Sequence, residues 1–150
     1  MATRSDANRA SAIRIRRAKC VSRAVKYTLD IIAGRHASPA LPHLTEVQFC
    51  KALAHVVPLV NPALSCRTEL PIDIPFLGIR LGTDRADIAA YSDNVVDFII
   101  EVKLAAVITV KHRNQAQTYG NVLGCDAFAL SVVPGRPGYS VELISYERVR

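Results

Sequence analysis

The sequence predicts an α/β domain in which a mixed β-sheet is flanked by helices. Between residues 64 and 103 apolar and polar residues alternate as they do in strands, whereas residues 45–57 and 109–123 follow a helical period and begin or end at capping signals. A chain of 150 residues, half of them hydrophobic, has the usual size of one domain and can bury a substantial core.

The N-terminal quarter carries the positive charge. Residues 1–40 hold nine basic and two acidic side chains, a balance of +7; because the whole chain carries +6, the remainder sums to −1. We expect residues 1–10 to be disordered, residues 12–33 to form a basic helix that stops at Gly34, and residues 38–43, with two prolines, to be a linker. The chain therefore divides into a basic N-terminal arm, residues 1–40, and a globular domain, residues 41–150.

Three roles are open for this arm. A positive arm on a near-neutral domain attracts a phosphate backbone through counterion release, and the cations that we assign to this role are Arg14, Arg16, Arg17 and Lys19. A run of charge is equally typical of a solvated tail. The Arg-rich, acid-poor start also resembles an organelle transit peptide, which ranks third.

A second helix begins at a capping box formed by Thr45 and Gln48. Its inward stripe contains one acid and four apolar residues, in the order Glu46, Phe49, Cys50, Leu53 and Val57. The helix dipole by itself favours an acid in the first turn, so Glu46 indicates a site only in company with other residues. Residues 58–62, with a proline near each end, are expected to end the helix.

Strands follow this helix. Residues 64–74 alternate as a strand whose prolines indicate an edge or irregular pairing, and residues 76–82 suggest a short strand and turn. Residues 85–91 alternate again, and Ser92 to Asn94 turn the chain. After the next strand we expect a helix over residues 109–123 that ends at Gly124, a buried strand over 126–133 and a final strand over 139–146.

Residues 95–103, VVDFIIEVK, are the most informative segment. Strand periodicity puts the even residues on one apolar face and three charged residues on the other: Val96, Phe98, Ile100 and Val102 against Asp97, Glu101 and Lys103. Removing such charges from water costs of the order of several kcal/mol each unless they are paired or bind a metal. An acid and a lysine on this strand therefore predict a site, although a pair at the end of a strand is also typical of a simple ion pair.

The turn before this strand decides whether a second acid joins the first. If the loop has three residues, all odd residues of the hairpin share one side, and Asp87 and Glu101 become diagonal neighbours. A two-residue loop of Asp93 and Asn94 would send the two acids to opposite faces. We predict the three-residue loop, or a bulge with the same effect.

Two acids close together are typical ligands of a hard cation, since Mg²⁺ takes oxygen ligands and keeps several waters. Asp87 and Glu101 would supply the carboxylates, and the Val102 carbonyl a third oxygen. Lys103 could orient or help deprotonate the attacking water and offset charge in the transition state. The predicted chemistry is hydrolysis of a phosphodiester.

These residues, in this order, resemble the PD-(D/E)XK nuclease superfamily, whose restriction-endonuclease-like core is an α-β-β-β-α-β unit. The matching positions are Glu46, Asp87, Glu101-Val102-Lys103 and Gln115. More narrowly, the chain is similar to the GxxExxY branch, with Glu46 and Phe49 at E-x-x-Y, Arg85 and Asp87 at R-x-D, and His112, Gln115 and Tyr119 at H-x-x-Q-x-x-x-Y. The likeness runs from about Leu44 to Pro134; the leading glycine falls at His43 and the tyrosine at Phe49.

The resemblance implies roles for the matching residues. Asp87 and Glu101 would bind Mg²⁺ or Mn²⁺, Lys103 would serve the water, and Glu46 would act at the edge of the metal. Gln115 would position Lys103 or a phosphate, while Arg85 and His112 would contact the nucleic-acid backbone.

Two functions are therefore weighed. The first is a Mg²⁺-dependent nuclease, a hydrolase acting on DNA; the alternative is a non-catalytic nucleic-acid-binding or structural module, such as one associated with a virion or genome, on the same fold. No apolar run is long enough for a membrane span or a secretory signal, which favours an intracellular protein, cytoplasmic or nuclear, with virion-associated or organellar sites left open. The sequence does not determine the oligomeric state, and a homodimer is left open. The four cysteines lack metal-site spacing and are expected to be free.

Overall fold

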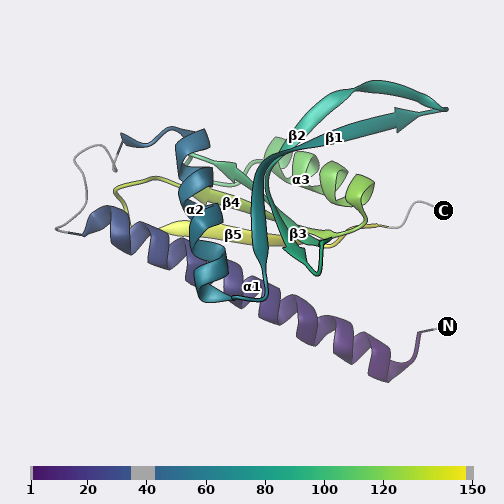
Figure 1. The fold of residues 1–150 in the computed structure, drawn as a ribbon, viewed down its shortest axis with the longest axis horizontal. Helices are drawn as coiled ribbons and strands as arrows, with labels where there is room; N and C mark the ends of the chain where they lie inside the picture. The colour runs from purple at the N-terminus through teal and green to yellow at the C-terminus, as the bar shows by residue number, and fades with distance from the viewer. Residues whose placement is uncertain (1, 35–42, 148–150) are drawn as a thin grey trace.

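The computed structural model describes residues 2–34 and 43–147. Within these residues five strands form one mixed sheet in the order β1-β2-β3-β4-β5, flanked by helices (Figure 1). The elements are α1 (Arg4–Ala33), α2 (Glu46–Val60), β1 (Ser65–Phe76), β2 (Ile79–Ser92), β3 (Val95–Lys103), α3 (Val110–Leu123), β4 (Asp126–Val132) and β5 (Tyr139–Ile144). β3 and β4 are parallel and are joined through α3, whereas the other neighbouring strands are antiparallel. The predicted α/β class is confirmed.

α1 is longer than the sequence predicted. The expected disorder of residues 1–10 is wrong for residues 4–10, which form the first turns of the helix. Thr3 and Asp6 form a capping box, in which the Thr3 hydroxyl accepts from the Asp6 N–H and the Asp6 carboxylate accepts from the Thr3 N–H, and this satisfies donors that would otherwise favour fraying. Of the predicted linker, residues 38–42 lie outside the described residues.

α2 begins and ends where the sequence predicted. The capping box of Thr45 and Gln48 is present, with Gln48 accepting from the Thr45 N–H. The helix continues through Pro58 and ends at Val60, inside residues 58–62, the segment predicted to end it. Proline removes only one helical hydrogen bond there, and the buried Val56 and Val57 hold this turn against the core.

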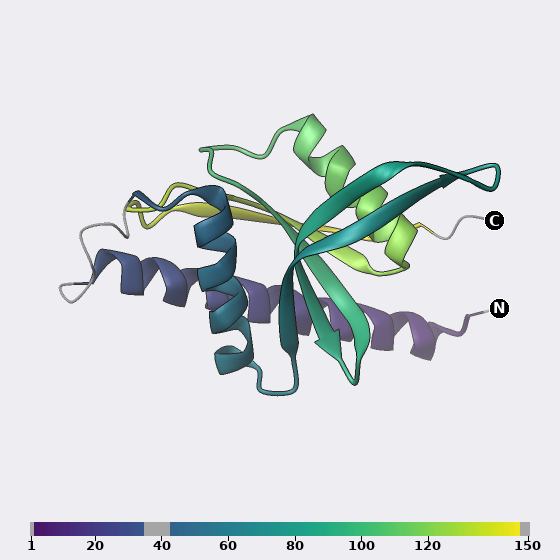
Figure 2. The same cartoon turned by 45° about the horizontal axis from the view of Figure 1, so that its top comes forward.

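The two faces of the sheet are covered by different helices (Figure 2). α1 and α2 pack together on one face, where buried side chains of both helices join Phe98, Ile100 and Val102 in the larger core cluster. α3 covers the opposite face, with Ala116 and Tyr119 against Ile99 and Ala127. Within the described residues no helix is both long and apolar enough to cross a bilayer.

β1 and β2 form a long hairpin whose outer part projects from the body of the molecule (Figures 1 and 2). The hairpin turns at Leu77 and Gly78, which both have positive φ, at 46° and 80°. The predicted break between the strand of residues 76–82 and that of residues 85–91 is absent, because β2 runs without interruption from Ile79 to Ser92.

The β2–β3 connection reaches the predicted arrangement by the second of the two expected routes. The loop has two residues, Asp93 and Asn94, both with positive φ, so the predicted three-residue loop is wrong. A register shift between Ala90 and Tyr91 then adds one residue on β3. Beyond this shift the odd-numbered residues of β2 lie opposite odd-numbered residues of β3, as predicted. The predicted bulge is thus confirmed.

The bulge also reverses the first residues of β3. Val96 packs in the α3-side cluster with Ile99, and Asp97 pairs with Arg17 of α1. The strict alternation predicted for residues 95–103 is therefore wrong for Val96 and Asp97, since one extra residue transfers the side chains before it to the other face.

Candidate metal and nucleic-acid site

The candidate site begins where β2 and β3 part. The pairing of the two strands ends at Ile88 and Ile100, and one further step in this register brings Asp87 opposite Glu101. The two acids are thus direct neighbours on the α3 side instead of the diagonal neighbours that the sequence suggested. An opening between two strands leaves backbone donors that need other partners.

The two carboxylates supply those partners. The Asp87 N–H donates to Glu101 Oε1 over 3.0 Å, and the Val102 N–H donates to Asp87 Oδ2 over 2.8 Å. Each acid therefore crosses the gap to the opposite strand. The bonds fix both side chains and hold their oxygens close together, as a shared ligand would require.

Burial sets the protonation of this pair. Glu101 is only 2% exposed, and burial, followed by the neighbouring Asp87 carboxylate, raises the pKa of Glu101 to about 9. Burial also raises the pKa of Asp87, although the hydrogen bond from Val102 opposes the shift. In the absence of a cation the pair therefore shares a proton at neutral pH, and a cation must displace it.

Lys103 and Glu46 lie close enough to the two acids to act on the pKa of Asp87, which the Glu46 carboxylate raises and the Lys103 ammonium lowers. Lys103 Nζ is 3.8 Å from Glu46 Oε1, and both side chains are substantially exposed. They line a cavity of about 230 Å³ together with residues at the start of α3, among them Gln115. Gln115 Nε2 donates to the hydroxyl of the buried Tyr119 over 2.9 Å, which orients the amide beside the cavity.

His112 has a partner that the sequence did not indicate. It is 2% exposed, and its Nε2 lies 2.7 Å from the Glu101 carbonyl oxygen, so this nitrogen carries the proton and donates. Nδ1 is buried without a hydrogen-bond partner among the described residues. The ring supports the backbone of Glu101 from α3, which makes His112 a positioning residue in this geometry.

The cations predicted to contact nucleic acid fall into two groups, an exposed group of Arg85, Arg16 and Lys19 and a paired group of Arg14 and Arg17. Arg85 is exposed on β2, with Nη1 4.0 Å from Glu69. Arg14 and Arg17 are in ion pairs: Arg14 Nε is 3.0 Å and Arg17 Nη1 is 3.4 Å from Asp126 Oδ2. Arg16 and Lys19 are exposed on α1.

Sequence reasoning missed Asp126, which is 1% exposed and also accepts from the Tyr146 N–H. The signal was available, because an acid at the start of an otherwise apolar buried strand needs cationic partners. Such partners are abundant in residues 1–40.

The donor set fits a hard cation with several water ligands. Among the described residues no three His, Cys, Asp or Glu side chains cluster to hold a metal, so the carboxylates of Asp87 and Glu101 stand as a pair. In an extended strand the N–H and C=O of one residue project to the same side, and the Val102 N–H already contacts Asp87, which favours its carbonyl as a third oxygen. Mg²⁺ characteristically binds through one or two carboxylates and retains waters.

Comparison with family models, with curated proteins and with solved structures finds no match for this chain.

Proposed function

We propose that the chain is a Mg²⁺- or Mn²⁺-dependent nuclease of the PD-(D/E)XK type, with DNA as the preferred substrate. The observation that carries the proposal is the meeting of Asp87 and Glu101 where β2 and β3 part, with Lys103 two residues further along β3. The order α2-β1-β2-β3-α3-β4 also supports it, since it matches the α-β-β-β-α-β order of the restriction-endonuclease-like core.

Each side chain has a role in this proposal. Asp87, Glu101 and the Val102 carbonyl would hold the ion, which when bound would polarise the phosphate and acidify a water. The Lys103 ammonium donates to the attacking water and stabilises negative charge on the phosphoryl oxygens. Glu46 restrains Lys103 through their ion pair. Water loses a proton to solvent as it adds to phosphorus, the bond from phosphorus to the leaving oxygen breaks, and that oxygen takes up a proton from solvent.

A cleavage assay tests the proposal. Plasmid, single-stranded DNA and RNA are incubated with the protein in Mg²⁺, Mn²⁺ or EDTA, beside Lys103→Met and a matched control, Lys51→Met, in an exposed lysine of α2. We expect metal-dependent cleavage that falls by roughly 10²-fold or more in Lys103→Met, the usual cost of losing one such group. Equal cleavage by Lys103→Met and wild type would mean that a contaminant is responsible.

Metal binding is measured separately by calorimetry. Wild type should bind Mn²⁺ at pH 8, and Asp87→Asn should not, because one of the two carboxylates is then neutral. Lys103→Met should still bind the ion. Failure of wild type to bind either cation at any pH up to about 9, the pKa of Glu101, would refute the metal site.

The second candidate is a non-catalytic nucleic-acid-binding module. The observation that favours it is a set of exposed cations on α1, on the other side of the sheet from α3. Binding of DNA in EDTA without cleavage in either metal would select this candidate.

A further inference from the structure

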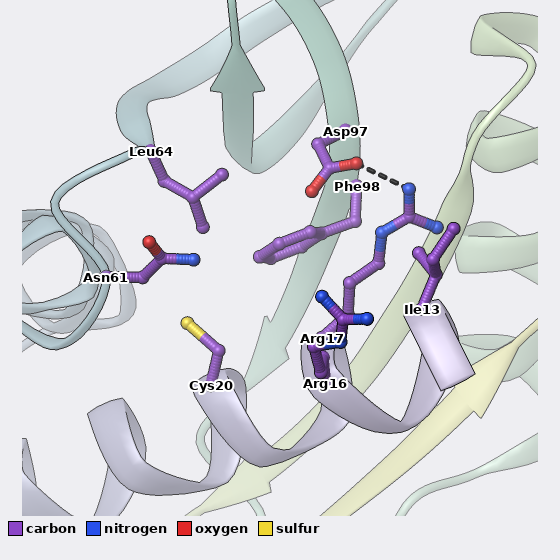
Figure 3. A pocket seen from close by; sticks show the side chains of 8 residues that line it. All are labelled: Ile13, Arg16, Arg17, Cys20, Asn61, Leu64, Asp97 and Phe98. Carbon is purple, nitrogen blue, oxygen red and sulfur yellow. Dashed lines mark hydrogen bonds and ion pairs between the residues drawn. The ribbon is translucent and has the colours of Figure 1, made fainter. Parts of the chain in front are cut away.

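The basic side chains of α1 differ in how they are used. Arg14 and Arg17 are turned to the body of the protein, where they neutralise Asp97 and Asp126. Figure 3 shows Arg17 joined to Asp97 across a cavity that Arg16 also lines. These two arginines fasten α1 to the first residues of β3 and β4, so their charge is neutralised within the fold.

Four other cations form a continuous row, which we name the α1 stripe: Arg16, Lys19, Arg23 and Lys26. At 100° per residue they fall within an arc of about 80° on the helix surface. All four are exposed, and none forms an ion pair with any residue that the structure describes. Asp30, one turn after Lys26, marks the end of the stripe.

We propose that the α1 stripe binds the phosphate backbone of a nucleic acid, as a surface separate from the carboxylate site. The stripe extends about 15 Å along the helix axis, and its charges recur every 4.5–6 Å or so. A nucleic-acid strand places phosphates at a comparable interval, so each cation can meet one. The inference deepens the proposed function and rests on it only in taking a polynucleotide as the ligand.

A lipid surface fits the same charges less well. A basic amphipathic helix that binds a membrane buries its own apolar face in the bilayer. The main apolar face of α1 is already buried, because Val21, Val25, Leu29 and Ile32 lie in the core against α2 and the sheet. The exposed apolar residues of α1 form two separate pairs towards the ends of the helix, Ile13 with Ile15 and Tyr27 with Ile31. Charge without a continuous free apolar face matches a phosphate backbone, which is bound through counterion release.

The stripe lies apart from the carboxylates. Arg16, Lys19 and Arg23 line a hollow with Val60 and Asn61 at the C-terminal end of α2. Glu46, beside Lys103, is at the opposite end of the same helix. The 15 residues of this helix separate the two surfaces by about 20 Å. A duplex that contacts both must cover roughly six base pairs at about 3.4 Å per pair.

The test is binding without catalysis. Affinity for a DNA duplex of about 20 base pairs, for the same sequence as RNA and for phosphatidylserine vesicles is measured in EDTA across salt concentrations. The triple variant Arg16→Gln, Lys19→Gln, Arg23→Gln is compared with a control that removes the same charge from exposed positions elsewhere, Lys51→Gln, Arg67→Gln, Arg136→Gln. A charge-conserving variant, Arg16→Lys with Arg23→Lys, is measured beside them.

We expect the slope of log K against log salt for the DNA duplex to become shallower by about 2 to 3 in the triple variant, because each phosphate that a cation neutralises adds about 0.9 to the slope. The control should change this slope by less than about 1, and the lysine variant should have the same slope as wild type. An equal change in variant and control, or tighter binding to vesicles than to either nucleic acid, would overturn the proposal. Because metal binding and cleavage are measured separately, failure of the stripe and failure of the carboxylate site remain distinguishable.

Discussion

Glu101 carries a carboxyl group into a position where almost no solvent reaches it. A raised pKa means that the folded protein binds a proton that the unfolded chain releases at lower pH. Between the unfolded value of 4.5 and the folded value of about 9, the folded state therefore holds more protons. Its stability must fall as pH rises through this window, by at most about 1.4 kcal/mol per pH unit.

Glu101→Gln should remove this dependence, because an amide of the same shape stays neutral. Compared with wild type, we expect the variant to be similar in stability near pH 4 and more stable by a few kcal/mol near pH 8, in chemical denaturation without metal. Adding Mn²⁺ should raise the free energy of unfolding of wild type at pH 8 and leave that of the variant unchanged. Parallel pH profiles for the two proteins would contradict the assignment of a buried, protonated Glu101.

At the scale of elements, the tip of the β1–β2 hairpin holds an unfavourable residue. Leu77 has φ 46° and is 90% exposed. A left-handed conformation costs an ordinary residue about 1 kcal/mol, and two-residue turns of this kind prefer Asn followed by Gly. Leu77→Asn should therefore raise the free energy of unfolding by about 0.5–1 kcal/mol. Ile79→Asn, at an exposed strand position, is the control and should give no gain; equal effects would refute the strain argument.

The junction of α3 and β4 depends on a missing side chain. A Cβ added at Gly120 would lie 2.7 Å from the Cys125 carbonyl oxygen, closer than backbone atoms allow. Helix propensity alone would favour alanine by up to about 1 kcal/mol, but this contact should dominate. We expect Gly120→Ala to destabilise the protein by about 1–3 kcal/mol in thermal or chemical unfolding. Gly138→Ala, with no atom near the added Cβ, should be nearly neutral.

The elements could be predicted where local chemistry decides them. β3 has the predicted bounds, and Thr109 and Gly124 cap α3 as their residue types indicate. The sequence predicted the β2–β3 bulge only as an alternative to a three-residue loop. The two-residue turn Asp93-Asn94 and the bulge each shift the register and compensate one another, so the alternation of side chains farther along the strands reveals neither of them. The first turns of α1 were missed because the Thr3 cap uses Asp6, a weaker signal than Glu or Gln at that position.

The candidate site was accessible to sequence reasoning for a related reason. Asp87, Glu101 and Lys103 stand out as charges on apolar strands, and such residues must meet a partner. The roles within residues 1–40 were not accessible in this way, because Arg14 and Arg16 are chemically alike and only the packing of α1 distinguishes the paired arginine from the exposed one. Contacts between distant segments, such as Arg17 with Asp126, leave no local pattern.

At the scale of the whole molecule, α1 is a layer of the core. Four of its large buried side chains, Val21, Val25, Leu29 and Ile32, would each lose about 1.5–3 kcal/mol on exposure, a sum comparable with the whole stability of a typical domain. The predicted division at residue 40 into an arm and a domain stays a prediction that truncation can test.

Deleting residues 2–33 should leave a chain without a cooperative unfolding transition, because Phe49 and Leu53 of α2 and the α1-side residues of β3 lose their cover. Deleting residues 2–10, all of them exposed, removes only the Thr3 cap and should cost about 1 kcal/mol or less. Circular dichroism during thermal unfolding distinguishes the two outcomes. A chain lacking residues 2–33 that unfolds as sharply as wild type would show that α1 is dispensable, and the α1 stripe would then belong to a detachable arm.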